Sequence, residues 1–307
     1  MGAFLACDWG GTNLRAWVVG EAGEVLDRRD FPLGISQLRP GEAPERFRYD
    51  VRPALAAEDL PAILCGMVGS NLGWRPGAVP YLDCPIDPAE LGRNLFQVQD
   101  GDAPVWIVPG LRGAGLTDAP DFMRGEETQV LGWGLSQAGV GRRTVCLPGT
   151  HSKWVLLEGE RLMGVTTFMT GELYAVLTRH SVLRSDAAVD DEAAFDAGLA
   201  AAGDGGALAA RIFSTRARVV AATAPARTES STSYLSGLLI GAEIAAAPAL
   251  TALGETEPVT LLGDPALCRW YARAFERAGR AFESFEGDRA VLAGLIALWR
   301  AGPGREA

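Results

Sequence analysis

The first apolar positions of the chain fall into two short runs on either side of Gly10-Gly11, within residues 4–19. Runs of this length around a glycine pair predict two β-strands joined by a tight hairpin, because glycine tolerates the positive φ angles of such turns. A second turn at residues 21–23 and a third apolar run at residues 25–31 follow. The chain is therefore expected to open as an antiparallel meander of three strands.

Residues 144–159 return to the plan of the opening hairpin, with an apolar run, a glycine turn and a second apolar run. When Gly149-Thr150 is laid on Gly11-Thr12, Lys153 falls on Arg15. This repeat predicts two related halves, each with its own hairpin. A change of composition at residues 136–143 marks the boundary between them.

Strands and helices alternate through the rest of the chain, so the predicted fold class is α/β. Strands are expected at residues 62–68, 104–109, 162–168, 259–262 and 281–285, a loop at residues 110–120, and helices at residues 170–180, 207–220, 230–247, 266–278 and 289–299. Thr170, Asp264 and Asp288 are expected to cap three of the helices. The domains are predicted at residues 1–141 and 142–287, with a last helix at residues 288–300 that packs back on the first domain.

Composition narrows the classes of function. The 307 residues exceed most single domains, and 48% apolar with 21% charged residues is ordinary for a globular protein. The formal net charge of −10, without a cluster of Lys and Arg, argues against nucleic acid or an anionic membrane as a partner. A small molecule is the expected ligand, and association into a homo-oligomer is compatible with the sequence.

The five cysteines are odd in number and widely spaced, mostly within apolar runs. They are interpreted as reduced core residues, and no Cys or His grouping has the spacing of a metal site. No signal peptide or membrane span is recognised, since the first apolar run is short and the most hydrophobic helix contains Glu243 and Pro248. A cytoplasmic location is therefore expected.

The opening hairpin has groups that suit a phosphate. The N–H groups of Gly10 and Gly11 have no side chains in the way, and Thr12 and Asn13 add side-chain donors. Asp8, at the end of the first strand, lies where a phosphate-bound Mg²⁺ would need a carboxylate, and Mg²⁺ takes only one or two from a protein. An ordinary glycine hairpin without a ligand is the alternative.

The second hairpin offers an equivalent set of groups: Gly149, Thr150, His151 and Lys153. Two such hairpins facing one cleft would clamp a polyphosphate from both sides. The alternative for Lys153 is a surface residue of a strand. Gly263-Asp264 lies between a strand end and a helix start, which is a recurrent place for a nucleotide in α/β folds.

Two further stretches offer groups for a sugar. A strand ends in the glycine-rich loop at residues 66–74, where Ser70 and Asn71 offer hydrogen bonds and Trp74 a flat apolar face. A plain connecting loop is the alternative. Glu126 and Glu127 begin a predicted helix, where negative charge suits the helix dipole and where one acid can also point into a cleft as a general base.

Seven segments, in order along the chain, carry a resemblance to a known family. They are Asp-Trp-Gly-Gly-Thr-Asn-Leu-Arg-Ala-Trp (8–17), Gly-Met-Val-Gly-Ser-Asn-Leu-Gly-Trp (66–74), Pro-Gly-Leu (109–111), Met-Arg-Gly-Glu-Glu-Thr-Gln (123–129), Pro-Gly-Thr-His-Ser-Lys-Trp-Val (148–155), Met-Thr-Gly-Glu-Leu (169–173) and Ser-Gly-Leu-Leu-Ile-Gly-Ala-Glu (236–243). Together they resemble the 2-dehydro-3-deoxygalactonokinase family of the actin–hexokinase–Hsp70 superfamily.

The resemblance implies two actin/ribonuclease H-like domains, each a mixed five-stranded sheet with helices, facing a central cleft that binds ATP and substrate. It implies ATP-dependent phosphorylation of the 6-hydroxyl of 2-dehydro-3-deoxy-D-galactonate, a step of galactonate catabolism. By analogy, Asp8 organises Mg²⁺, the two hairpins hold phosphates, and the region around Gly263 meets the nucleoside.

Phosphoryl transfer needs positioning, neutralisation of charge and a base near the accepting hydroxyl. Lys153 and Mg²⁺ near Asp8 are expected to neutralise charge, and Glu126 is preferred as the base over Asp8 and Glu127. The substrate is an acid, so its carboxylate should meet a guanidinium, for which the candidates are Arg15 and Arg124. The expected substrate site is completed by Ser70, Asn71, Trp74, Glu127 and Thr170.

Two other functions stay open from the sequence. One is a superfamily kinase for a neutral sugar or another ketodeoxy acid, because the motifs do not separate epimers. The other is a non-enzymatic sugar sensor or an actin-like filament protein. A sensor would be expected to carry a helix-turn-helix before the first hairpin, yet only three residues precede Phe4.

Overall fold

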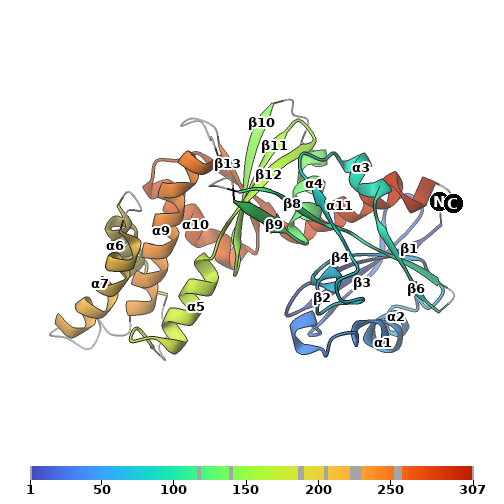
Figure 1. Ribbon diagram of the computed structural model, residues 1–307, viewed down its shortest axis with the longest axis horizontal. Coiled ribbons are helices and arrows are strands. Elements are labelled where there is room, and N and C mark those ends of the chain that lie inside the picture. The colour runs from blue at the N-terminus through green and yellow to red at the C-terminus, as the bar shows by residue number, and fades with distance from the viewer. Residues whose placement is uncertain are drawn as a thin grey trace. The chain divides into compact units, whose positions relative to one another are not determined.

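The computed structural model describes residues 2–101, 103–115, 119–137, 141–185, 190–203, 207–221, 230–251 and 258–305 (Figure 1). The chain forms two units. The first comprises Met1–Arg142, Leu156–Val165 and Gly287–Ala307, and the second comprises Arg143–Val155 and Thr166–Glu286. Residues 138–140 of the predicted boundary lie outside the described residues.

The first unit contains a six-stranded sheet in the order β3-β2-β1-β4-β7-β6. β1 runs antiparallel to β2 and parallel to β4, and β7 runs parallel to β4 and antiparallel to β6. The predicted meander and the two buried strands that follow it are confirmed. The strands are β1 (Phe4–Trp9), β2 (Leu14–Val19), β3 (Val25–Phe31), β4 (Ala62–Gly66), β6 (Phe96–Asp100) and β7 (Ala103–Ile107).

A second sheet, whose strands lie in the second unit except for Leu156–Val165 of β11 and β12, repeats this strand order without the extra edge strand. It has the order β12-β11-β10-β13-β14, with β13 parallel to both β10 and β14. Its strands are β10 (Arg142–Leu147), β11 (Ser152–Glu158), β12 (Arg161–Phe168), β13 (Val259–Gly263) and β14 (Phe282–Glu286).

A strand order shared by the two sheets confirms the two related halves and the expected fold class, a pair of actin/ribonuclease H-like domains. The first sheet departs from the predicted five strands, because β6 adds a sixth strand at the edge beside β7. A cleft between the units stays a prediction.

A small sheet of β5 (Tyr81–Asp83), β8 (Gly110–Ala114) and β9 (Pro120–Met123) also lies in the first unit. The prediction of a loop at residues 110–120 is therefore wrong for β8. Gly110, the first residue of β8, allows close packing within the sheet, since a Cβ there would lie 2.5 Å from the ring of Tyr81. Residues 116–118 lie outside the described residues.

Two helices of the first unit cross at glycines. α4 (Glu126–Ser136) packs against α11 (Gly287–Ala301), and a Cβ at Gly132 would lie 1.9 Å from the carbonyl oxygen of Ala290. A Cβ at Gly294 would lie 2.0 Å from the carbonyl oxygen of Thr128 in α4. Only a residue without a side chain permits such contacts. Because α11 also contacts β1 and β4, it fixes α4 to the sheet.

Shorter helices complete the described part of the first unit, and apolar residues of η1, α1, η2 and η3 join the core on the sheet. They are η1 (Ile35–Gln37), α1 (Ala43–Arg46), η2 (Phe47–Val51), α2 (Arg52–Ala54), η3 (Met67–Gly69), α3 (Pro88–Arg93) and η4 (Pro303–Arg305).

α9 is the helix to which the others of the second unit attach, since it contacts α5, α6, α7 and α10 (Figure 1). α6 and α9 also cross at glycines, where a Cβ at Gly237 would lie 2.0 Å from the carbonyl oxygen of Phe195. None of the described helices combines the length and the apolar composition that a bilayer crossing requires. Those of this unit are α5 (Thr170–His180), α6 (Glu192–Ala202), α7 (Leu208–Ala221), α9 (Ser231–Thr251) and α10 (Pro265–Arg277).

Of the three predicted helix caps, only Asp264 is one, and its carboxylate accepts from two backbone N–H groups of α10. Thr170 is instead the first residue of α5, and its hydroxyl donates to Glu243. Asp288 lies in the first turn of α11 and pairs with two arginines. Both side chains are thus held by charged partners rather than by the helix backbone.

Candidate active site

The turn between β1 and β2 has backbone N–H groups available to a ligand. The N–H of Gly10 donates to the carbonyl of Asn13 at 2.9 Å, and the carbonyls of Gly10 and Gly11 accept from the backbone of residues 35–36. Within the described part of the chain, the N–H groups of Gly11, Thr12 and Asn13 make no hydrogen bond. Three donors therefore face outward, although Gly10 does not supply one as expected.

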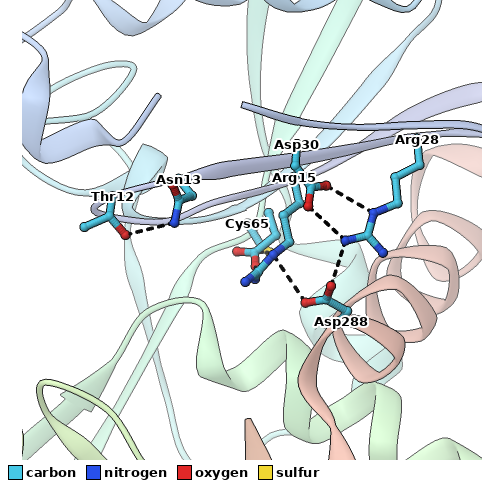
Figure 2. A network of polar contacts seen from close by, with 8 residues as sticks. Thr12, Asn13, Arg15, Arg28, Asp30, Cys65 and Asp288 are labelled. Carbon is cyan, nitrogen blue, oxygen red and sulfur yellow. Dashed lines mark hydrogen bonds and ion pairs between the residues drawn. The ribbon is translucent and has the colours of Figure 1, made fainter. Parts of the chain in front are cut away.

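Neither glycine of this turn uses the positive φ expected of a tight hairpin. Close packing limits the side chain at one of them, because a Cβ at Gly11 would lie 3.1 Å from the hydroxyl oxygen of Ser36, and the neighbouring Gly34 must be glycine, because its Cβ would lie 2.1 Å from the carbonyl oxygen of Gly11. Thr12 and Asn13 are exposed at the tip, where the Asn13 amide donates to the Thr12 hydroxyl at 3.4 Å (Figure 2). Their polar groups face solvent beside the unpaired amides.

Asp8 lies near the end of β1, directly opposite Arg15 on β2. Its side chain is 13% exposed, and its Oδ2 lies 3.2 Å from Arg15 Nη1. Burial raises the pKa of Asp8, and the Arg15 guanidinium opposes this rise by stabilising the ionised form. Among the described residues, the other oxygen, Oδ1, meets only the weak thiol donor of Cys65, at 3.8 Å. That oxygen can therefore accept a further ligand.

Arg15 is shared between two carboxylates of its own chain (Figure 2). Its Nε lies 3.3 Å from Asp288 Oδ1, and the other oxygen of Asp288 lies 2.8 Å from Arg28. Arg28 in turn pairs with Asp30 at 3.1 Å. The role of Arg15 as a partner of the substrate carboxylate stays a prediction, and the structure gives its guanidinium two carboxylate partners within the chain, Asp8 and Asp288. Asp288, expected only as a helix cap, belongs to the same network of charges.

The N-terminus of α4 reaches Asp8 through two glycines. A Cβ at Gly125 would lie 3.0 Å from the Cα of Gly66, and a Cβ at Gly66 would lie 3.3 Å from Asp8 Oδ1. Both glycines have positive φ angles, 107° and 91°, which side chains disfavour. These contacts bring Glu126 and Glu127, the first residues of α4, to the same end of the sheet as Asp8.

The two glutamates differ in exposure. Glu127 is fully buried, with Oε2 accepting the Gly125 N–H at 2.7 Å, and burial together with Glu126 raises its pKa to about 7. Glu126 is partly exposed, and its Oε2 accepts the backbone N–H of Arg124 at 3.0 Å. A ligand can therefore touch Asp8 and Glu126, whereas the carboxyl of Glu127 is covered.

Arg124 is buried and holds the chain around Tyr81. Its Nη2 donates to the carbonyls of Val79 and Pro80 at 3.1 and 3.2 Å, and its guanidinium lies 4.2 Å from the centroid of the Tyr81 ring. Its Nη1 is buried with no hydrogen-bond partner among the described residues, and a Cβ at Gly69 would lie 2.4 Å from it. An unpaired buried donor costs free energy, so an anion bound beside Gly69 would be stabilised.

The loop at residues 66–74 divides into an accessible and a buried part. Asn71 is exposed, and the hydroxyl of Ser70, which is partly exposed, accepts the N–H of Leu72 at 3.2 Å. Trp74 is only 6% exposed, and its ring meets Phe47 edge to face with centroids 5.3 Å apart. The expectation of a flat face for a sugar therefore fails at Trp74, because its large ring is buried in the core.

The turn between β10 and β11 is supported by the start of α5. The carbonyl of Thr150 accepts the N–H of Glu172 at 2.9 Å, and a Cβ at Gly171 would lie 2.4 Å from the carbonyl oxygen of Gly149. His151 Nε2 lies 2.5 Å from the Glu172 carboxylate, and both side chains are half exposed. Among the described residues, the N–H groups of residues 149–151 have no backbone partner. Turn amides and a helix N-terminus thus lie together.

Lys153 lies on β11 just after this turn and is only 6% exposed. Its ammonium donates to the hydroxyl of Thr167 on β12 at 2.7 Å. The alternative of a surface strand residue is therefore wrong. A buried cation near the turn adds positive potential to its N–H groups.

A cavity of about 350 Å³ adjoins the same turn within the second unit. Gly149, Thr150 and Gly171 belong to its lining, and apolar side chains and hydroxyls of α9 and α10 supply much of the rest. An apolar pocket with a few hydroxyls, next to unpaired turn amides, suits a nucleoside that carries phosphates. The lining residues of α9 and α10 are Thr232, Ser233, Ser236, Leu239, Ile240, Leu267, Trp270 and Tyr271.

Gly263 and Asp264 do not line this cavity. They end β13 and start α10, and Asp264 uses its carboxylate as the helix cap. Their expected contact with a nucleotide stays a prediction, while α10, which they begin, carries Leu267 and Trp270 into the cavity wall. The sequence did not point to these two residues, because their spacing is that of any helix packed on a sheet.

A family model described as 2-keto-3-deoxy-galactonokinase matches residues 8–298 of the chain. The probable 2-dehydro-3-deoxygalactonokinase DgoK1 of Rhizobium meliloti (strain 1021) is 37% identical over 98% of this chain and 97% of its own length. The 2-dehydro-3-deoxygalactonokinase of Escherichia coli (strain K12) is 34% identical over 96% of this chain and 97% of its own length. The crystal structure of a Sinorhizobium meliloti protein assigned to the same activity matches with a TM-score of 0.84 and 34% identity, covering 97% of this chain and 98% of that one.

Proposed function

The chain belongs to the 2-keto-3-deoxy-galactonokinase family, and from this premise we propose how its residues perform the reaction. It is a carbohydrate kinase that transfers the γ-phosphoryl group of ATP to the 6-hydroxyl of 2-dehydro-3-deoxy-D-galactonate, a step of galactonate catabolism. The proposal for its residues rests on one observation: each of the two equivalent hairpins has backbone N–H groups, those of residues 11–13 and of residues 149–151, that lack backbone partners within the described residues.

The nucleotide is assigned to the second unit. Its phosphates would accept hydrogen bonds from the N–H groups of residues 149–151, and its adenosine would occupy the adjoining cavity beside Trp270 and Ile240. The buried ammonium of Lys153 supports negative charge at this turn. The turn at residues 10–13 is assigned to a phosphoryl group in the same way.

Asp8 is the proposed protein ligand of Mg²⁺. Its donor chemistry fits, because one carboxylate oxygen is free of strong partners and Mg²⁺ needs only one or two protein carboxylates beside phosphate oxygens and waters. Bound there, Mg²⁺ would offset negative charge on the transferred phosphoryl group. Arg15 opposes the rise that burial causes in the pKa of Asp8, and it holds the carboxylate in place.

Glu126 is the proposed general base. Its carboxylate takes the proton of the 6-hydroxyl as that oxygen forms a bond to the γ-phosphorus, and the bond from the γ-phosphorus to the bridging oxygen breaks to release ADP. Glu126 is preferred over Glu127 because it is partly exposed, whereas the carboxyl of Glu127 is covered. Glu127 instead orders the loop before α4 through its contact with Gly125.

Arg124 is the proposed partner of the substrate carboxylate. Its unpaired Nη1 beside Gly69 is a buried donor that an acid would satisfy, and Ser70 and Asn71 lie next to this position in the chain. Arg15 is not used for this role, since two carboxylates of the chain already hold it. A carboxylate partner of this kind would favour sugar acids over neutral hexoses.

Release of ADP should be measured with ATP, Mg²⁺ and either 2-dehydro-3-deoxy-D-galactonate, its gluconate epimer or neutral hexoses. We expect turnover of the galactonate compound to exceed that of the others. Glu126→Gln should lower kcat about a hundredfold or more with the KM for ATP nearly unchanged, because only proton transfer is lost. Glu90→Gln, an exposed acid in the first turn of α3, is the control. Wild-type turnover in Glu126→Gln would remove Glu126 as the base.

We infer a cytoplasmic location from the cysteines, which are all unpaired thiols in the structure. Unpaired buried thiols suit a reducing compartment. A homo-oligomer stays a prediction from the sequence, and size-exclusion chromatography with light scattering tests it.

A further inference from the structure

The second unit contains one carboxylate that accepts four side-chain hydrogen bonds. Glu243, on α9, is only 2% exposed. Its Oε1 accepts from the Ser152 hydroxyl at 2.7 Å and from the indole N–H of Trp154 at 2.8 Å. Its Oε2 accepts from the hydroxyls of Thr170 and Tyr271, the latter at 2.8 Å. The carboxylate therefore satisfies donors from β11, α5 and α10 at once.

These donors surround the turn at residues 149–151. Ser152 directly follows the turn in the chain. Thr170 directly precedes Gly171, the residue that packs closely against Gly149. Thr170 and Tyr271 also line the cavity next to the turn. Glu243 is thus tied to the chain on both sides of the turn and to the wall of the cavity, without lining the cavity itself.

We propose that Glu243 is a positioning residue for the nucleotide phosphates, because it fixes the turn at residues 149–151 against the start of α5. This inference rests on the proposed placement of ATP in the second unit. Phosphate binding by backbone N–H groups depends on their direction, and Ser152 sets where the turn ends while Thr170 sets where the helix begins. Glu243 acts on the phosphates only through these two residues.

An amide cannot reproduce the four hydrogen bonds of the carboxylate as they stand. Each oxygen of Glu243 accepts two hydrogen bonds, whereas a glutamine side chain would turn an NH₂ group toward two of the four donors. Because the indole N–H of Trp154 can only donate, the glutamine oxygen must take the place of Oε1, and the hydroxyls of Thr170 and Tyr271 must then turn from donors into acceptors. The contact with Thr170 at the start of α5 is thereby reversed and loses its charged acceptor. The substitution is nearly equal in volume, so it changes hydrogen bonding rather than packing.

A purely structural role is the competing explanation, and it predicts a different result. Loss of a buried network destabilises the unit whatever its function, so a lower Tm alone would not support positioning. Positioning predicts a selective loss of nucleotide affinity in the folded enzyme. A matched control is Val259→Ala, since Val259 is fully buried at the start of β13, paired with Thr144 at the start of β10, far along the strands from the turn.

The experiment is equilibrium titration of ATP and of 2-dehydro-3-deoxy-D-galactonate, each alone, onto the full-length wild type, Glu243→Gln and Val259→Ala. We expect the Kd for ATP to rise at least tenfold in Glu243→Gln and the Kd for the sugar acid to stay within twofold. Steady-state kinetics should agree, with a larger change in the KM for ATP than in kcat. Val259→Ala should lower Tm and leave both affinities unchanged.

Trp154→Phe is a milder second variant that removes one donor and keeps an aromatic six-membered ring in place of the indole, and it keeps the test valid if Glu243→Gln does not fold. It should raise the Kd for ATP by about twofold to fivefold, the range expected for one hydrogen bond. Wild-type ATP affinity in a folded Glu243→Gln or Trp154→Phe would overturn the positioning role. Absence of ATP binding by the wild type would instead remove the placement of ATP on which the inference rests, and the two failures are thereby distinguished.

Discussion

The two hairpins have the same place in their sheets, yet the chain supports them by opposite means. At the first, Arg15 joins Asp8 to Asp288, and Asp288 also pairs with Arg28. The side chains of Arg15, Arg28 and Asp288 are all more than a third exposed. At the second, the carboxylate behind the turn, Glu243, is buried and held by neutral donors, while Glu172 pairs with His151 at the exposed side. The duplicated backbone has therefore kept the turn, while the side chains behind each turn have diverged.

This difference separates two physical effects. Ion pairs near the surface are screened by salt and are worth little singly, whereas hydrogen bonds to a buried carboxylate are short in range and insensitive to salt. The first hairpin should therefore respond to ionic strength and to charge substitutions, and the second to the loss of individual donors.

The largest effect is expected for Arg15→Met, which removes the cation beside Asp8. Because Asp8 is largely buried, loss of its partner should favour the protonated carboxyl and lower kcat/KM by about a hundredfold. Arg29→Met, an exposed change on β3, is the matched control. Steady-state kinetics at pH 7 measures both variants. Equal activity of the two would contradict the role of ion pairing at the first hairpin.

A second prediction concerns Glu127, whose pKa is raised to about 7 from an ordinary 4.5. The folded state keeps the proton in this interval while the unfolded state loses it, so stability contributed by this group falls as pH rises from 4.5 to 7. The fall amounts to up to ~3 kcal/mol. In Glu127→Gln the fall is absent, so the free energy of unfolding of the variant should rise relative to that of the wild type between pH 5 and pH 8. Urea unfolding at both pH values measures the difference, and parallel pH dependence would contradict the raised pKa.

The smallest effect is expected for Asp288→Asn. Arg15 keeps Asp8 as a partner in this variant, so kcat/KM should fall only about threefold, in line with a partly exposed pair. In 0.5 M NaCl, most of the difference in kcat/KM between the wild type and Asp288→Asn should disappear. Asp30→Asn, which leaves the contacts of Arg15 intact, is the control. A larger loss that persists in high salt would mean that Asp288 acts on Asp8 by more than charge.

Much of the fold was predictable, because strand runs and glycine turns are local in the sequence. The repeat of Gly11-Thr12 at Gly149-Thr150 predicted the duplication that the two strand orders confirm. The sixth strand of the first sheet and the pairing of β8 with β9 were not predicted. Both depend on which edge a polar or glycine-rich segment finds after folding, and periodicity does not encode this.

The side-chain partners were predicted less well, because they are distant in the chain. Arg28 meets Asp288 across 260 residues, and Ser152 meets Glu243 across 91. Arg15 was interpreted as a substrate ligand, since its own carboxylate partners could not be inferred from their positions. Trp74 failed for a related reason: an aromatic residue after a glycine loop can serve a ligand or the core, and only burial distinguishes the two.

The position of α11 in the chain has a consequence for biosynthesis. The first unit begins with β1, but α11, which carries Asp288 and crosses α4 at Gly294, is translated after all residues of the second unit. The first unit can therefore be completed only after every residue of the second unit has been synthesised. Folding should finish at the carboxylates near Asp8, and a released chain truncated before residue 287 should bind nucleotide without catalysing the reaction.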